Sequence, residues 1–158
     1  MKTTSAGLAA ALALASAALL TGASPAAAES AAERAVAARQ AGFKQIGAAF
    51  KAVNDELRGG KPDLAAVASA AARLEGHAGQ LPTWFPRGSG PESGADTGAR
   101  AAVWSDAAGF ADAAANLRTQ TSQLNALSRA GDLAAVRKQA ALVGAACKTC
   151  HTAYREED

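Results

Sequence analysis

Near its C-terminus the chain carries the run Cys147-Lys148-Thr149-Cys150-His151, which has the spacing C-x-x-C-H. This spacing is the attachment pattern of a c-type haem. Two thiols three positions apart lie on one face of a helix, so both can add to the two vinyl groups of one porphyrin. The imidazole of His151 follows the first thiol by four positions on the same face, where it can reach the iron. The run therefore predicts one covalent haem c.

Two other uses of the cysteines remain open. A redox pair C-x-x-C is expected at the N-terminus of a helix that follows a strand, whereas this pair lies deep in the predicted last helix. A zinc site needs a fourth ligand at a regular spacing, and none appears nearby. A haem-free helical bundle that uses Cys147 and Cys150 as a disulfide or metal site is therefore the weaker hypothesis.

The first 28 residues have the pattern of an export signal. Lys2 supplies a small positive region, residues 7–20 are uncharged and rich in alanine and leucine, and residues 26–28 are alanines suited to cleavage. The uncharged stretch is shorter than the roughly 20 apolar residues that a membrane-spanning helix needs. Bacteria attach c-type haem in the periplasm, which agrees with export. We expect a mature periplasmic protein that begins near Glu29, with residues 29–158 as one domain.

Removal of this signal limits the possible iron ligands. Met1 is the only methionine, so the mature chain has none, and ligation by methionine and histidine together is excluded. His77 is the only other histidine. It falls beside the apolar stripe of its predicted helix, and we interpret it as a partly exposed surface residue. A six-coordinate, low-spin electron carrier with His77 as the sixth ligand remains an alternative.

The composition favours helices and argues against some partners. Apolar residues make up 49% of the chain but aromatic ones only 4%, and the abundance of alanine suits tightly packed helices better than a β-sandwich. The formal net charge of +2 is too small to indicate binding to nucleic acid or to a membrane surface.

Four helical stretches are expected after the signal. They cover about residues 30–58, 63–81, 99–128 and 132–154, with a long loop rich in Pro, Gly and Ser over residues 82–98. Apolar stripes with a period near 3.5 residues predict an all-α fold, an antiparallel up-down-up-down four-helix bundle. Both cysteines fall on the core-facing stripe of the last helix, so the covalently bound haem must lie inside one end of the bundle.

Two residues of the first helical stretch can be related to a haem. Arg39 lies within the apolar stripe, where an unpaired buried cation is costly, so either its stem extends to water or an anion lies beside it. Haem carries two propionates, and arginine binds carboxylates bidentately, so we favour a propionate partner. Phe43 follows one turn later and is expected over the ring, opposite His151, filling the pocket without binding iron. Plain core packing explains Phe43 nearly as well.

Three further residues of interest lie at the start of the long loop and at the end of the last helical stretch. Trp84 and Phe85 begin the long loop, and two aromatic residues in a polar loop are expected to cover apolar surface. Arg155 follows His151 by four positions. It is either a surface cation, favourable at a helix C-terminus, or it lies along the haem face on the histidine side.

The mature chain, from about residue 29 onward, resembles the cytochromes c′, the class II c-type cytochromes of bacterial periplasms. Class I cytochromes c place the haem motif near the N-terminus and supply a later methionine, so they do not match. The resemblance rests on the C-x-x-C-H run near the C-terminus followed by Ala153-Tyr154-Arg155, on Val103-Trp104-Ser105-Asp106, on Leu81-Pro82 before a glycine-rich loop, and on the pair Arg39-Gln40 four residues before Phe43.

The resemblance implies that Cys147 and Cys150 form thioethers to haem c and that His151 is the fifth iron ligand. Low-spin relatives with the same fold place a ligating methionine on the first helix, and this chain has none. Relatives often form homodimers through the first two helices, so a homodimer is possible here.

The resemblance also implies haem contacts outside the motif. Arg39 and Gln40 match haem-contacting positions of the first helix, and Thr97 matches one in the loop before Trp104. Phe43 falls where the family places its distal residue, on the open side of the iron.

Together these features predict a five-coordinate, high-spin iron with an apolar open face. Such a face offers no hydrogen bond to bound oxygen, whereas NO needs little polar stabilisation, so NO and to a lesser degree CO are the expected ligands. We expect a gas-binding or electron-transfer protein with an unidentified redox partner. It need not be an enzyme, because no general acid or base is visible near the proposed open face.

Overall fold

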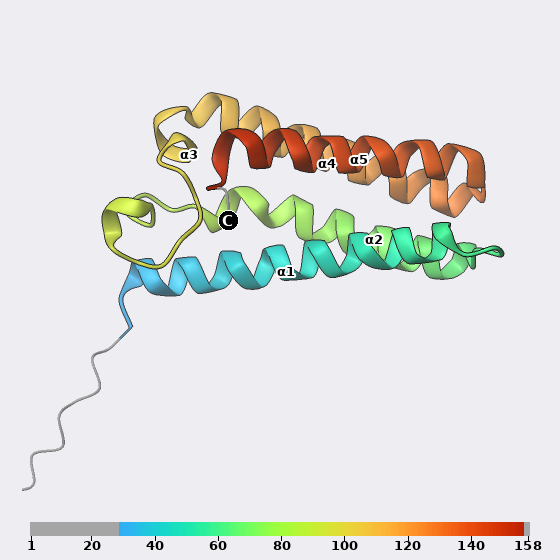
Figure 1. Ribbon diagram of the computed structural model, residues 1–158, viewed down its shortest axis with the longest axis horizontal. Helices are drawn as coiled ribbons and strands as arrows, with labels where there is room; N and C mark the ends of the chain where they lie inside the picture. Colours follow the sequence, from blue (N-terminus) through green and yellow to red (C-terminus); the bar gives the residue numbers. More distant parts are fainter. Residues whose placement is uncertain (1–28, 157–158) are drawn as a thin grey trace, which may run out of the picture.

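The computed structural model describes residues 29–156, so the predicted export signal lies outside the described residues. The chain forms four long helices. They pack side by side in Figure 1, and each runs antiparallel to the next. This arrangement confirms the predicted all-α four-helix bundle. The long helices are α1 (Ala31–Arg58), α2 (Leu64–Gln80), α4 (Ala107–Ala130) and α5 (Leu133–Tyr154), and the short ones are η1 (Leu81–Trp84), η2 (Pro91–Ser93) and α3 (Ala102–Ser105).

Side-chain caps fix where the long helices begin. Ser30 and Glu33 form a capping box, in which the Ser30 Oγ accepts from the Glu33 amide at 3.1 Å and the Glu33 carboxylate accepts from the Ser30 amide at 2.6 Å. Asp63 and Asp132 cap α2 and α5 in the same way, by accepting hydrogen bonds from first-turn amides. Gly131, with a φ of 78°, lets the chain turn sharply between α4 and α5.

The third helical stretch differs from its prediction. We expected one helix over residues 99–128, but the chain forms the single turn α3, breaks at Asp106, and starts again as α4, which extends to Ala130. Asp106 leaves helical geometry, with φ −114° and ψ 57°, and its side chain accepts from the Gly109 amide at 3.2 Å. The apolar pattern continues across the break, so periodicity alone does not reveal it.

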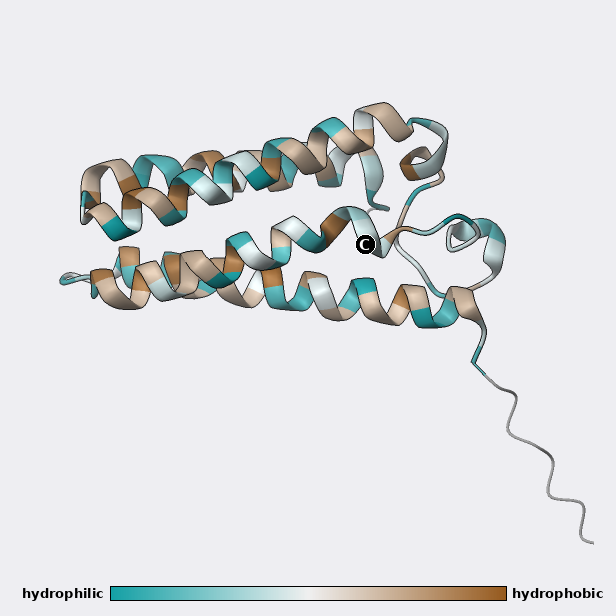
Figure 2. Cartoon of the chain, turned by 180° about the vertical axis from the view of Figure 1, so that it is seen from behind, coloured by the Kyte–Doolittle hydropathy of each residue, from teal (hydrophilic) through white to brown (hydrophobic). Residues whose placement is uncertain are grey.

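The core runs along the bundle between the helices. Apolar residues alternate with polar ones along each long helix in Figure 2, as expected for helices that bury one face. Helix α1 packs extensively on α2, α2 on α4, and α4 on α5, whereas α1 and α5 contact each other only sparsely. None of the described helices is long and apolar enough to cross a membrane. The fully buried core residues include Val53, Val67, Leu74, Leu81, Leu124, Val136 and Val143.

One end of the bundle collects the segments that carry the predicted site residues. The N-terminus of α1, the loop after η1 and the C-terminus of α5 lie together at the left of Figure 1. Arg39 and Phe43 belong to the N-terminal half of α1, and His151 belongs to the last turn of α5. The topology therefore brings residues more than 100 positions apart in sequence to the same end.

A pair of leucine variants tests this assignment of the core. Leu124→Ala removes a fully buried side chain and should lower the free energy of unfolding by about 2–5 kcal/mol, since a cavity remains in place of the lost side chain. Leu142→Ala is the matched control, because Leu142 is 45% exposed. Denaturant titrations of both variants measure the difference, and equal losses would contradict the proposed packing.

Candidate haem site

The C-x-x-C-H run occupies the last two turns of α5. Cys147 and Cys150 are half-buried free thiols, and Cys147 packs against the hydrophobic core. His151 lies on the exposed side of the next turn, and its carbonyl accepts from the Arg155 amide at 3.0 Å where the helix ends. The two thiols and the imidazole are thus grouped on one short helical segment, as the spacing predicts.

The environment of these groups favours their neutral forms. Burial raises the pKa of both thiols, and the neighbouring Cys147 raises the pKa of Cys150 further. Burial also lowers the pKa of His151, and the positive charge of Arg155 lowers it further. The imidazole is therefore unprotonated at neutral pH, the form that can bind a metal. Reactive redox cysteines instead have a lowered pKa.

The described part of the structure offers no set of side chains that could complete a zinc site at the cysteines. Within residues 29–156, no group of three or more histidine, cysteine, aspartate or glutamate side chains is placed to hold a metal ion. His77, the other histidine, is half-buried and lies beside a small hollow with Gln45, Ala48 and Arg73. Because Gln45 and Ala48 are exposed residues of α1, this hollow lies on the outer side of the α1–α2 seam.

Arg39 is buried and held by the long loop. Only 3% of the residue is exposed, so the alternative in which its stem extends to water is wrong. Its guanidinium donates to the Ser89 carbonyl at 2.6 Å, the Ser89 Oγ at 3.1 Å and the Thr97 Oγ1 at 2.5 Å. Burial lowers its pKa, and the charge of Glu92 opposes that effect. The expected propionate contact stays a prediction.

The loop also connects the other predicted contact residues. The Gln40 side chain donates to the Asp96 carbonyl at 3.1 Å, next to Thr97. The following backbone then joins the end of α5, because Ala99 pairs with Arg155 in an isolated bridge and the Glu156 amide donates to Gly98 at 2.8 Å. Arg39, Gln40, Thr97 and Arg155, predicted from three separate segments, are thereby connected through one loop.

A group of aromatic rings fills the space between these segments. Successive edge-on contacts lead from Phe43 of α1 to Phe85 at 6.1 Å, from Phe85 to Phe110 at 4.8 Å, and from Phe110 to Tyr154 of α5 at 5.4 Å between ring centroids. The guanidinium of Arg39 lies 5.1 Å from the Phe85 ring centre. We call this group the aromatic cluster; it consists of Phe43, Trp84, Phe85, Trp104, Phe110 and Tyr154.

Sequence reasoning missed part of the cluster. Trp84 and Phe85 were expected to cover apolar surface, and they do so against Phe43. In the sequence, Phe110 is one residue of an apolar stripe and Trp104 is part of a family motif, and neither pattern predicts a contact with the other rings. The available signal was the distribution of aromatic residues, because the chain has seven in all and six of them meet at this end.

Phe43 lies level with His151 across the α1–α5 seam. Its neighbour two turns along α1, Phe50, contacts α5 at Gly144, where an added Cβ would lie 3.7 Å from the Phe50 ring. Because α1 and α5 are antiparallel, a position seven residues before Phe50 faces one seven residues after Gly144. Phe43 and His151 satisfy this relation. The expected placement of Phe43 opposite His151 therefore agrees with the register of the two helices.

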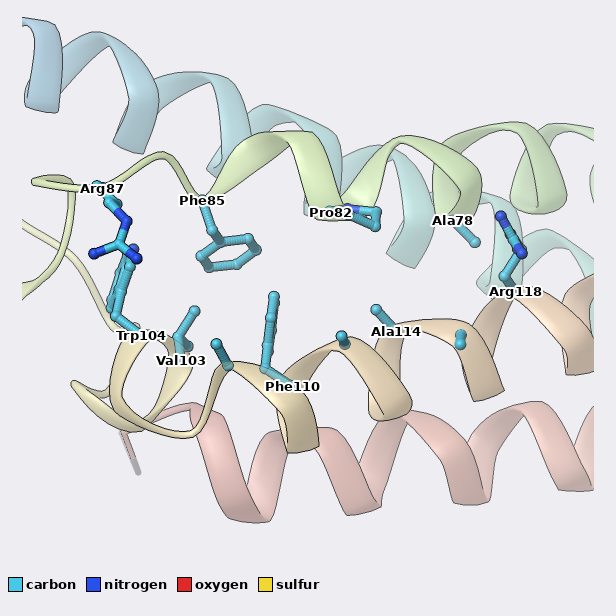
Figure 3. A pocket seen from close by; sticks show the side chains of 12 residues that line it. Ala78, Pro82, Phe85, Arg87, Val103, Trp104, Phe110, Ala114 and Arg118 are labelled. Atoms are coloured by element: carbon cyan, nitrogen blue, oxygen red, sulfur yellow. The ribbon is translucent and has the colours of Figure 1, made fainter.

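A cavity of about 410 Å³ adjoins the aromatic cluster on the side of α2 and α4. Phe85 and Phe110, whose rings touch edge-on, both line it, and Arg87 and Arg118 lie toward its two ends (Figure 3). Neither the cysteines nor His151 line it. The cavity is therefore not part of the candidate haem site.

These observations fit a covalent haem. The two thiols share one helix face, the imidazole is neutral, a cluster of rings supplies an apolar surface, and a buried guanidinium lies beside that surface. The sparse contact between α1 and α5 leaves the motif accessible from α1. A helical bundle with these features in its last helix defines a c-type cytochrome of the bundle class.

Comparison with known proteins identifies the family. Residues 34–155 match the family model described as Cytochrome C′. The chain is 36% identical to the cytochrome c′ of Rubrivivax gelatinosus over 124 residues, which cover 78% of this chain and 95% of that protein. The chain therefore belongs to the cytochrome c′ family, and its cofactor is haem c.

Solved structures and other relatives agree with this assignment. The crystal structure of the Rubrivivax gelatinosus protein superimposes with a TM-score of 0.73 at 32% identity, covering 79% of this chain and 97% of that one. A cytochrome c′ variant from Alcaligenes xylosoxidans, ferrous with bound NO, gives a TM-score of 0.73 at 29% identity, covering 80% and 97%. Cytochrome c-556 of Agrobacterium fabrum is 36% identical over 118 residues, which cover 74% and 77%.

The Arg39 network predicts the effect of its removal. Arg39→Leu leaves the buried Ser89 carbonyl without its donor and should lower the free energy of unfolding by about 1–3 kcal/mol. Hydrogen exchange of the loop amides should increase, and the midpoint potential of the holoprotein should shift. Arg34→Leu is the control, because Arg34 is exposed and its guanidinium donates to the Glu29 carbonyl, away from the loop. Unchanged exchange and potential in Arg39→Leu would contradict this role.

The raised thiol pKa values predict slow alkylation. In haem-free chain from a host without cytochrome maturation, Cys147 and Cys150 should react with iodoacetamide more slowly at pH 7.5 than in the unfolded chain, because the folded thiols hold less thiolate. The rate should rise as the pH passes above the ordinary thiol value. Mass spectrometry of quenched samples measures both rates, and folded thiols that react faster would instead support a redox pair.

Proposed function

We propose that this chain is an exported haem c protein that binds NO and CO at an iron ligated on the protein side by His151 alone. The observation that carries the proposal is the position of its candidate ligands. Met1 precedes the proposed mature chain, and His77 lies beside a hollow on the outer side of the α1–α2 seam. Opposite His151, α1 presents Phe43, whose ring packs against Trp84 and Phe85.

The residues of the site have separate roles in this proposal. Cys147 and Cys150 would hold the haem as thioethers, and His151 would bind the iron as a neutral imidazole. When bound, haem c supplies an iron centre that takes up a gaseous ligand and changes oxidation state. Arg39 would hold the loop against α1 while its charge balances a propionate. Phe43 would occupy the open side without offering a ligand.

The polarity of this end favours NO over oxygen. Arg39 directs its guanidinium at Ser89 and Thr97, and the Trp104 indole donates to the Pro86 carbonyl at 3.2 Å. These hydrogen bonds direct both side chains at the loop. Bound oxygen needs a hydrogen bond on the open side of the iron, whereas NO does not. Known complexes support both gases, since the Alcaligenes xylosoxidans relative has been obtained with NO and, in another variant, with CO.

Export and attachment belong to the same proposal. The pattern of residues 1–28 and the periplasmic site of c-type haem attachment support a periplasmic protein that begins near Glu29. Gln40, Thr97 and Arg155 are proposed to border the haem because the loop connects them with Arg39 and with the end of α5.

The resting spectrum tests the proposed coordination. Purified ferric and ferrous holoprotein should show high-spin bands, and NO should change the ferrous spectrum, because no side chain competes for the sixth position. Optical and electron paramagnetic resonance spectra with and without NO measure both states. Low-spin bands at rest would establish a sixth protein ligand, and a protein that lacks a Soret band after expression with cytochrome maturation would contradict the haem assignment.

A pair of methionine variants sharpens this test. Phe43→Met places a thioether level with His151 and should convert the resting iron to a low-spin, six-coordinate state with a raised midpoint potential. Phe50→Met, two turns further along α1 and beside Gly144, should leave the spectrum high-spin. Identical spectra for the two variants would show that Phe43 does not face the iron.

A further inference from the structure

The only tyrosine of the chain joins the last turn of α5 to the start of α4. The Tyr154 hydroxyl donates to the Asp106 Oδ2 at 2.8 Å, while the other oxygen of Asp106 caps α4 through the Gly109 amide at 3.2 Å. Asp106 therefore uses both oxygens, one for its own helix and one for α5. The proposed function assigns no role to this contact.

Gly109 provides the space that this hydrogen bond needs. A Cβ built at position 109 would lie 2.5 Å from the Tyr154 hydroxyl and 2.3 Å from the Asp106 Oδ2. Glycine is unfavourable inside a helix, so its presence in the first turn of α4 calls for a local reason. Close approach of Tyr154 supplies that reason. The next residue, Phe110, packs its ring edge-on against Tyr154 at 5.4 Å.

These contacts restrain the helical turn that carries His151. Tyr154 follows His151 by three residues, which is about one turn. The Tyr154 carbonyl also accepts from the Arg100 amide at 3.0 Å, so both its side chain and its backbone are tied to the segment around α3. On the opposite side, α1 contacts α5 only sparsely. The orientation of the last turn is therefore set mainly from the side of α3 and α4.

We propose that the hydrogen bond between Tyr154 and Asp106, accommodated by Gly109, orients His151 for binding to the iron. Tyr154 and Asp106 are positioning residues, because they act through the helix that carries the ligand. The inference rests on the proposed function, in which His151 binds the haem iron. Asp106 is exposed, so the bond should matter less for folding than for the direction of the imidazole.

Two variants remove the bond from opposite sides. Tyr154→Phe keeps the ring and loses the hydroxyl. Asp106→Ser keeps a good N-cap residue for α4 but cannot reach Tyr154 with a second oxygen. In ferrous holoprotein without NO, each should shift the iron–histidine stretching band in resonance Raman spectra to lower frequency and broaden it. The double variant should show no further shift, because both changes remove one interaction.

A glycine pair separates positioning from stability. Gly109→Ala adds a methyl group where Tyr154 now lies and should shift the same band, although alanine favours the helix. Gly76→Ala in α2 is the matched control, because a Cβ there meets no atom within 4 Å, and its band should equal that of the unmodified protein. Intact-mass analysis checks that all variants carry one haem per chain.

Several results would overturn the inference. Unchanged bands in Tyr154→Phe, Asp106→Ser and Gly109→Ala would do so. A loss of haem content with a normal band in the remaining holoprotein would also overturn it, because the hydrogen bond would then serve haem attachment during maturation. A resting low-spin protein would instead contradict the proposed function. In that case Soret-region circular dichroism of the same variants decides the inference, and spectra equal to that of the unmodified protein reject it.

Discussion

The burial of one cation determines how this end of the bundle is built. Arg39 lies on the inner face of α1, and a buried guanidinium is tolerated only when hydrogen bonds replace its water. Ser89 and Thr97 supply those bonds from the loop, so the loop must fold back onto α1. The same loop continues into the backbone bridge between Ala99 and Arg155. The relative position of α1, the loop and the end of α5 thus depends on satisfying one side chain.

The distribution of side-chain size explains why the proposed haem site lies at this end. Away from it the core consists of aliphatic residues such as Val53, Leu124 and Val143, which are fully buried and allow close approach of the helices. At the Arg39 end, six of the seven aromatic side chains meet, with Phe110 buried and the other five partly buried. Their edge-on contacts keep the segments apart by the width of a ring, and α1 and α5 make few contacts with each other. A flat, apolar cofactor suits an end lined in this way.

The parts that could be predicted from sequence are those with a local signal. Helix starts at Ser30 and Asp132 follow from capping residues, and the grouping of Cys147 and His151 follows from helical spacing. The break at Asp106 could not be predicted, because the apolar pattern continues through it and only the hydrogen bond to Gly109 reveals it. The hydrogen-bond partners of Arg39 could not be predicted either. They lie 50 and 58 residues away in a loop without periodicity, so a buried arginine could be predicted there but its partners could not.

The direction of α5 explains why the same two cysteines suit haem attachment better than redox exchange. A thiol is made reactive at a helix N-terminus, where the amides carry partial positive charge and stabilise the thiolate. Cys147 and Cys150 instead lie near the C-terminus of α5, where the unpaired carbonyls carry partial negative charge, and burial raises their pKa values further. A helix C-terminus favours a nearby cation, and the iron beside His151 would be one. The end of the helix at which the cysteines lie thus distinguishes haem attachment from redox exchange, which the spacing C-x-x-C alone does not.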